Sequence, residues 1–342
     1  MNSAKSARLY RAGGSATATR RQFLKRTAVS LATAGLAAAA FPAGRSAAAS
    51  IFAITDGKTR RSRVALLENP RVMTDLGVRK KVLTEMLEDG LCISLDKKTP
   101  AAAWQSLLTS DDRILLKFNR ADADRLGTSE IMASVLIESL MRAGFDAKQI
   151  TLLEAVTLGD WAGDLSKPEF GWTEKTYDFG SGQEQLIKAA EWATAIINVP
   201  FLKTHRIAGM TGCLKNLSHG LIRRPALYHA NQCCPFIPDI VAMPVLRNKI
   251  RLHVMNALRV IYDNRPDASR DSLDLATALV VSTDPVAADT IGQSILDALR
   301  QEKGLKPITP EPGLVLQHRL ASEKGLGTNN IEYIDIVRPV VV

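Results

Sequence analysis

The sequence predicts an α/β fold in which helices cover both faces of a mixed or mostly parallel sheet, giving three layers. Two observations predict it. After residue 50, short apolar runs of strand length alternate with longer amphipathic runs of helical period, which is typical of a sheet covered by helices. Residues 113–155 also contain one complete strand–helix–strand unit. We therefore expect residues 50–342 to form a single α/β domain.

The first half of this domain is expected to supply three strands and two helices. Residues 63–68, 113–119 and 149–155 are short apolar runs, which predicts strands. Residues 75–91 carry an apolar stripe at helical spacing and clustered charges, so we expect a solvated amphipathic helix there. Residues 130–144 repeat apolar side chains at helical spacing and end on a glycine, which predicts a second helix.

The second half begins with a segment of different character. Residues 160–182 contain turn residues and aromatics without periodicity, so we expect a long surface loop or lid. Residues 193–203 are apolar throughout, which predicts one buried strand. Residues 276–299 have the pattern of a strand, a turn and a helix. Residues 311–324 predict a last amphipathic helix, and residues 331–337 a last strand.

Residues 1–49 are expected to be a targeting segment outside the domain. They carry eight of the 44 basic residues and none of the 35 acidic ones, which leaves 36 basic against 35 acidic residues in the remainder. The alkaline character of the chain therefore belongs to this segment. The charge balance gives no support to a nucleic-acid partner.

The segment Thr19–Lys25, TRRQFLK, resembles the twin-arginine export consensus. The alternative is the basic start of an ordinary secretory signal. The apolar run Ala28–Phe41 that follows is too short to cross a bilayer, so we expect no stable membrane span. Small residues in Ser46–Ser50 predict cleavage near Ala48 or Ala49. The expected partner is the twin-arginine translocase, and the expected location is the periplasm.

The four cysteines, Cys92, Cys213, Cys233 and Cys234, fit no zinc-finger or ferredoxin spacing. An oxidising compartment permits a disulfide between Cys213 and one of the adjacent pair. Free thiols near ligand groups are the other possibility. The sequence leaves both open.

The segment FLKTHRIAGMTGCLKNLSHG, residues 201–220, is the strongest candidate for a site, because it follows a buried strand where ligands bind in open α/β sheets. Lys203 and Lys215 can neutralise a phosphate or carboxylate, and a desolvated Lys215 can become a nucleophile or covalent tether. His205 suits proton transfer. A solvated surface position is the alternative for Lys215. Further candidate ligand-binding residues of the segment are Thr204, Gly212 and Asn216.

Histidines and Cys213 are the candidate metal ligands. Cys213, His219 and His229 offer soft or borderline donors. Taken alone, His229 and His253 are each expected to be ordinary structural histidines rather than ligands. His318 is expected on the surface of the last helix.

Other candidate ligand contacts lie outside this segment. Lys117 and Asn119 end a buried strand, and a lysine there generally needs an anionic partner. Asp284, followed by Pro285, has the pattern of a helix N-cap. Asp289 lies about one turn further on and can reach the site or bond a neighbouring backbone.

Several of these segments resemble the family called the domain of unknown function 362, found alone in exported proteins and beside iron–sulfur ferredoxin modules. The matching segments are LLKFN, INVPFLKTH, GMTGCLKNLSHG and STDPVAADT, together with His229, and they span residues 113–290. Members commonly have an aspartate where this chain has Asn256. A role that depends on that carboxylate is therefore not expected here.

The pattern H-x-x-A-G-x-T-G-x-x-K, from His205 to Lys215, resembles a segment of the nickel-pincer lactate racemases. That resemblance implies that His205 is a proton-transfer base, that Lys215 carries a pincer nucleotide covalently, and that His219 or His229 binds nickel. The earlier catalytic histidine of the racemases has no counterpart, because no histidine precedes His205.

Two functions follow as hypotheses. The first is an enzyme, racemase-like or oxidoreductase-associated, that uses a metal or a nickel-pincer-like nucleotide and an anionic small molecule. The second is a non-catalytic periplasmic ligand-binding or cofactor-handling protein, associated with iron–sulfur chemistry. An iron–sulfur cluster in this chain is the less favoured cofactor, since four irregularly spaced cysteines barely supply its ligands.

Overall fold

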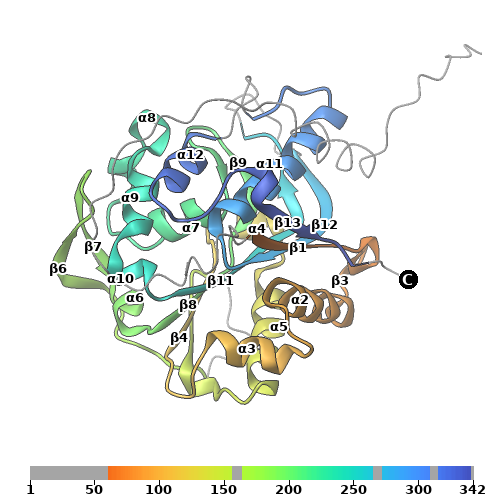
Figure 1. Cartoon of the computed structure of the whole chain (residues 1–342), viewed down its shortest axis with the longest axis horizontal. Helices are drawn as coiled ribbons and strands as arrows, with labels where there is room; N and C mark the ends of the chain where they lie inside the picture. The colour runs from red at the N-terminus through yellow and green to blue at the C-terminus, as the bar shows by residue number, and fades with distance from the viewer. Residues whose placement is uncertain (1–60, 156–163, 265–271, 309–314, 340–342) are drawn as a thin grey trace, which may run out of the picture.

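The computed structural model describes residues 61–155, 164–264, 272–308 and 315–339 (Figure 1). A nine-stranded mixed sheet lies at its centre. Its main path runs in the order β13 (Ile334–Val337), β1 (Ser62–Glu68), β12 (Leu273–Ser282), β11 (Ile250–Ile261), β8 (Ala195–Asn198), β4 (Ile114–Lys117) and β5 (Ile150–Leu153). Off this path, β9 (Phe201–His205) pairs with β11 and with β10 (Gly209–Thr211).

Helices cover both faces of this sheet (Figure 1). One group consists of α2 (Lys80–Leu95), α3 (Pro100–Leu107) and α5 (Ser129–Arg142). The opposite group consists of α6 (Lys188–Trp192), α7 (Cys213–His219), α9 (Phe236–Ala242), α10 (Pro244–Arg247), α11 (Pro285–Glu302) and α12 (Leu316–Glu323). Shorter pieces are α4 (Ala123–Leu126), α8 (Ala230–Cys233), β2 (Met73–Thr74), β3 (Gly77–Val78) and the 3-10 turns Pro70–Val72, Ala147–Gln149, Pro225–Tyr228 and Ile331–Tyr333. The expected three-layer α/β fold is confirmed.

The two-residue period of the strands divides the core between the two faces. Along β1, Ala65 and Leu67 pack with residues of α2 and α5, whereas Val64 and Leu66 pack with residues of α11. The strands β4, β8, β11 and β12 alternate in the same way. Because the parallel strands β4 and β8 are buried on both faces, their sequences are apolar except for the last residue of each.

The expected single strand at residues 193–203 is wrong. The chain forms β8 and β9 there, separated by Val199 and Pro200. Proline has no N–H to donate to a strand ladder, so the pairing is interrupted at this point. After the break, β9 pairs with the second half of β11, which shifts the following segment away from the end of β8.

The expected loop at residues 160–182 is only partly correct. Residues 160–163 lie outside the described part, but β6 (Trp172–Asp178) and β7 (Gln183–Ile187) form an antiparallel hairpin beside the main sheet (Figure 1). Thr173 is the one fully buried residue of β6, so the alternation that predicts a strand is weak.

The targeting segment also lies outside the described residues, as do residues 311–314 of the predicted last helix. Within the described ranges, no helix combines the length and the apolar character that crossing a membrane requires.

Candidate functional site

The carboxyl ends of the parallel strands β4, β5 and β8 bring a polar group together. Lys117, whose side chain is fully buried, donates to Glu154 Oε2 (2.9 Å), to the carbonyl of Phe118 (2.5 Å) and to Asn216 Oδ1 (3.1 Å). Asn216 in turn donates to Asn198 Oδ1 (2.7 Å). Burial lowers the pKa of Lys117, while Glu154 opposes that shift. The anionic partner predicted for Lys117 is therefore present inside the protein.

Lys203 is paired in a similar way. Its Nζ donates to Asp122 Oδ2 (2.5 Å) and to the carbonyl of Ala121 (2.9 Å), and burial lowers its pKa against the effect of Asp122. Thr204 donates to the carbonyl of Ile261 (3.2 Å). Asn119 is buried near the end of β4. Neither Glu154 nor Asp122 was predicted from the sequence, although Glu154 directly follows β5 and Asp122 lies five residues after β4.

The helix α7 is held by a carboxylate from a distant segment. Asp289 of α11 accepts from the backbone N–H groups of Cys213 (2.5 Å) and Leu214 (3.0 Å), which satisfies two free donors at the start of α7. A Cβ at Gly212 would collide with this carboxylate, so only glycine fits there. This arrangement sets the position of Lys215, one residue further along α7.

Five side chains meet at the end of α7, and we call them the imidazole cluster: His205, Lys215, His219, His229 and Cys233. Lys215 is buried, and its Nζ lies 3.4 Å from His229 Nε2 and 3.9 Å from Cys233 Sγ. The ring of His229 stacks on His205, with centroids 5.7 Å apart, and meets His219 edge-on at 4.8 Å. Three separate segments of the chain supply these groups.

Backbone carbonyls determine which nitrogens of two rings carry protons. His229 donates from Nδ1 to the carbonyl of Pro225 (2.9 Å), so its Nε2 has a lone pair near Lys215. His219 Nε2 lies 3.0 Å from the carbonyl of Tyr228, which makes that nitrogen the donor in the neutral ring. Its Nδ1, 3.0 Å from the Ser218 hydroxyl, keeps the lone pair.

The ring of His205 has the opposite arrangement. Its Nδ1 accepts from the backbone N–H groups of Ile207 (3.2 Å) and Ala208 (3.1 Å). The proton of the neutral ring is therefore on Nε2. His205 can donate a hydrogen bond from that atom.

Burial also keeps the imidazoles neutral. Desolvation, with a contribution from the neighbouring Lys215, lowers the pKa of His205 and of His219 to about 3, and it lowers the pKa of His229. Desolvation lowers the pKa of Lys215 to about 8, while Cys233 opposes that shift. The pKa of the Cys233 thiol is raised by burial, against the effect of Lys215. Near neutral pH these rings offer lone pairs rather than charges.

Three members of the cluster can hold a metal ion. One donor atom each from His219, His229 and Cys233 lies within 4.8 Å of the others. Cys213, which we predicted as a ligand, lies elsewhere: it is buried in the apolar cluster beside α11, and burial next to Asp289 raises its pKa well above the usual value. The spacing of His229 and Cys233, four residues apart, was the signal that the sequence analysis missed. All four cysteines are free thiols.

The remaining candidates have structural contacts. Asp284 caps α11, as expected, by accepting from the backbone N–H groups of Val286 and Ala287, both at 2.9 Å. His253 is fully buried, and its Nδ1 lies 3.0 Å from Asn198 Nδ2. The surface position predicted for His318 is wrong. Its side chain is fully buried, 4.0 Å from Asp289, because α12 packs against α9 and α11.

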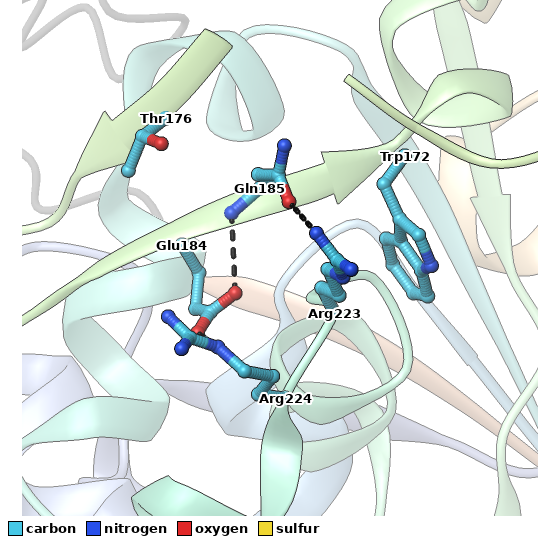
Figure 2. Close-up of a pocket in the computed structure, with 6 residues that line it drawn as sticks. All are labelled: Trp172, Thr176, Glu184, Gln185, Arg223 and Arg224. Carbon is cyan, nitrogen blue, oxygen red and sulfur yellow. Dashed lines mark hydrogen bonds and ion pairs between the residues drawn. The ribbon is translucent and has the colours of Figure 1, made fainter. Parts of the chain in front are cut away.

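A cavity of about 510 Å³ lies beside the β6–β7 hairpin, lined by Trp172, Thr176, Glu184, Gln185, Arg223 and Arg224 (Figure 2). Arg224 donates to the buried Glu184 (2.6 Å), and Arg223 to the neutral amide of Gln185 (2.5 Å). Tyr228 connects this cavity to the imidazole cluster, because its hydroxyl lies 3.5 Å from Glu184 and its carbonyl contacts His219. The sequence analysis did not identify this cavity.

Comparison with known proteins supports one of the two resemblances. Residues 162–294 match the family described as a domain of unknown function, number 362. This segment contains the whole imidazole cluster. The comparison with curated proteins finds no match. Nothing in these comparisons supports the racemase resemblance.

Proposed function

Taking the chain as a member of the domain of unknown function 362 family, we propose that it is an enzyme that binds a metal or metallo-organic cofactor and an anionic small molecule. The observation that carries the proposal is the imidazole cluster. Burying several polar groups side by side costs free energy unless they have partners, and such groups gather at functional sites. The proposal includes twin-arginine export and a periplasmic location.

The donor set of the cluster fits a transition metal. His219, His229 and Cys233 would hold it, because imidazole and thiolate ligands suit zinc, cobalt, nickel and copper ions. A bound metal would supply Lewis acidity toward an anionic oxygen. His205 stacks on His229 and carries its proton on Nε2, so its role is to donate a hydrogen bond from that atom to the bound molecule.

The anionic molecule has a different set of candidate partners from those expected. Lys117 and Lys203 are already paired with Glu154 and Asp122. Arg223 contacts a neutral amide at the cavity shown in Figure 2, so its charge is available to a carboxylate or phosphate. The proposal therefore places the anionic group of the ligand in this cavity.

The test uses the mature protein purified from the periplasmic fraction after export by its own signal. Elemental analysis and intact mass should give either stoichiometric metal or extra mass on Lys215. Replacing Arg223 with Gln should weaken binding of inorganic phosphate at least tenfold without removing the metal. Protein that is metal-free and unmodified, both as purified and after addition of zinc, would contradict the proposal.

A non-catalytic ligand-binding protein is the second candidate, favoured by the polar lining of the cavity. The enzyme needs the His205 side chain, whereas the binding protein does not. A binding protein should retain its affinity for an anion in a His205→Gln variant, and it should also lack a metal.

A further inference from the structure

We propose that Lys215 is itself a metal ligand, completing a four-donor centre with His219, His229 and Cys233. The inference rests on the proposed function and deepens it, because it selects one role for Lys215. As a ligand, its amine binds the metal directly, and it neither carries a covalent cofactor nor acts as a cation for the substrate.

The distances from Lys215 Nζ to neighbouring donor atoms support the inference. With metal–nitrogen distances of about 2.0 Å and a metal–sulfur distance of about 2.3 Å, a tetrahedral site places neighbouring nitrogens about 3.3 Å apart and nitrogen and sulfur about 3.5 Å apart. Lys215 Nζ lies 3.4 Å from His229 Nε2 and 3.9 Å from Cys233 Sγ. These are close to two edges of such a tetrahedron. The other three donors lie within 4.8 Å of one another, so their separations would shorten by up to about 1.5 Å on binding the metal.

The surroundings of the amine favour coordination over a free charge. Lys215 is 5% exposed, and within the described ranges no ion pair joins it to a carboxylate. A buried ammonium group without a carboxylate partner is unfavourable. By contrast, Lys117 and Lys203, the two other buried lysines near the sheet edge, each have one.

The second contacts of the rings are those of metal-binding histidines. His229 donates its far N–H to the carbonyl of Pro225, which orients the other nitrogen toward Lys215. His219 contacts the carbonyl of Tyr228 in the same manner.

The donors also indicate the class of metal. Two imidazoles, an amine and a thiolate suit zinc or cobalt(II), whereas magnesium and calcium need oxygen ligands. One cysteine cannot hold an iron–sulfur cluster. Because Lys215 has a flexible four-carbon stem, it is the ligand that can move away and open a position for an anionic molecule.

The experiment titrates cobalt(II) into the mature exported protein after a chelator has removed its metal. The wild-type protein should have an unmodified mass and show the visible bands of tetrahedral cobalt with a thiolate charge-transfer band. Lys215→Arg keeps the charge but cannot ligate, so cobalt affinity should fall at least tenfold. The cobalt affinity of the Lys215→Met variant should fall by the same factor. Tighter binding in Lys215→Met would overturn the inference, because it would mean that Lys215 only repels the metal.

Matched variants separate ligation from damage to the fold. Cys233→Ser should abolish the charge-transfer band, whereas Cys234→Ser, at the adjacent buried cysteine, should keep it. Lys249→Arg, at a half-buried lysine on backbone carbonyls, should bind cobalt as the wild type does. Thermal unfolding of each metal-free variant checks that it is folded.

The outcomes also distinguish this inference from the proposed function. Wild-type protein that binds neither cobalt nor zinc would contradict the proposed metal itself. If the wild type binds cobalt and the Lys215 variants bind it equally well, only the role of Lys215 is wrong. Extra covalent mass on Lys215 would also overturn the inference while leaving the cofactor proposal intact.

Discussion

At the scale of single residues, two side chains are buried although the sequence pattern allowed or predicted a position at the surface. Lys215 had a solvated position as one alternative, yet it is buried beside His229. His318 was expected at the surface, yet it lies beside Asp289 in the interior. A helical stripe says which residues share a face, but it does not say how much of the opposite face other elements cover.

Because the pKa of Asp289 is raised, we expect the stability of the protein to depend on pH. Desolvation raises its pKa to about 7, against the backbone hydrogen bonds that lower it. The usual pKa of an aspartate is about 3.9, so between these values the folded state holds a proton that the unfolded state has lost. The contribution of Asp289 to stability is therefore complete below pH about 4 and is lost as pH rises through about 7.

Asp289→Asn should remove this dependence. The free energy of unfolding of the wild type, relative to the variant, should fall by about 1.4 kcal/mol per pH unit across that interval. Denaturant unfolding of both proteins from pH 4 to pH 8 measures it. If the free energies of unfolding of the two proteins changed in parallel with pH, the raised pKa of Asp289 would be contradicted.

At the scale of elements, the helix α11 is the clearest agreement between sequence and structure. Asp284 and Pro285 predicted its start, and the structure places the cap there. The cap does more than begin the helix, because Asp284 also accepts from Ser62 Oγ (2.5 Å) and from the N–H of Thr328 (2.9 Å). It therefore connects three distant segments.

Asp284→Ala should consequently cost more than the loss of an ordinary cap. We expect a loss of about 2 to 4 kcal/mol in the free energy of unfolding, because buried donors would be left without partners. The matched control is Thr99→Ala at the start of α3, where the side chain accepts from one N–H, and about 1 kcal/mol is expected. Equal losses in the two variants, measured by denaturant unfolding, would show that the extra contacts of Asp284 contribute nothing.

At the scale of the whole molecule, the sheet topology assembles the site. The parallel strands β4, β5 and β8 end at one edge, which places Lys117, Glu154 and Asn198 together. The antiparallel pairing of β9 and β10 then turns the chain back into α7, whose end carries the imidazole cluster. The candidate site thus depends on segments from residue 117 to residue 233.

The export of the whole chain is predicted from the arginine pair in residues 19–25 alone. Replacing Arg20 and Arg21 with lysine should leave unprocessed protein in the cytoplasm, because lysine does not reproduce the planar, multiply donating guanidinium group. Cell fractionation and N-terminal sequencing measure this, and the wild-type mature chain should begin next to Ala48 or Ala49. Lysine substitutions at Arg8 and Arg11 are the control. Normal processing of the variant would favour an ordinary secretory signal.

The sequence by itself determined the α/β class, the N-cap of α11 and the segment that carries the candidate site. These features depend on local patterns: apolar periodicity, an aspartate before a proline, and glycines between basic residues. The helix at residues 130–144 and the strand at residues 63–68 were predicted for the same reason and are confirmed within two residues.

Only the tertiary structure decided which side chains meet. Cys233 rather than Cys213 joins His219 and His229, because α7 turns Cys213 toward α11 while the chain returns at α8. Two of the lysines expected to bind a ligand, Lys117 and Lys203, proved to be paired with Glu154 and Asp122, which are distant in sequence. Such contacts depend on how strands pair and helices pack, and no local pattern of residues encodes them.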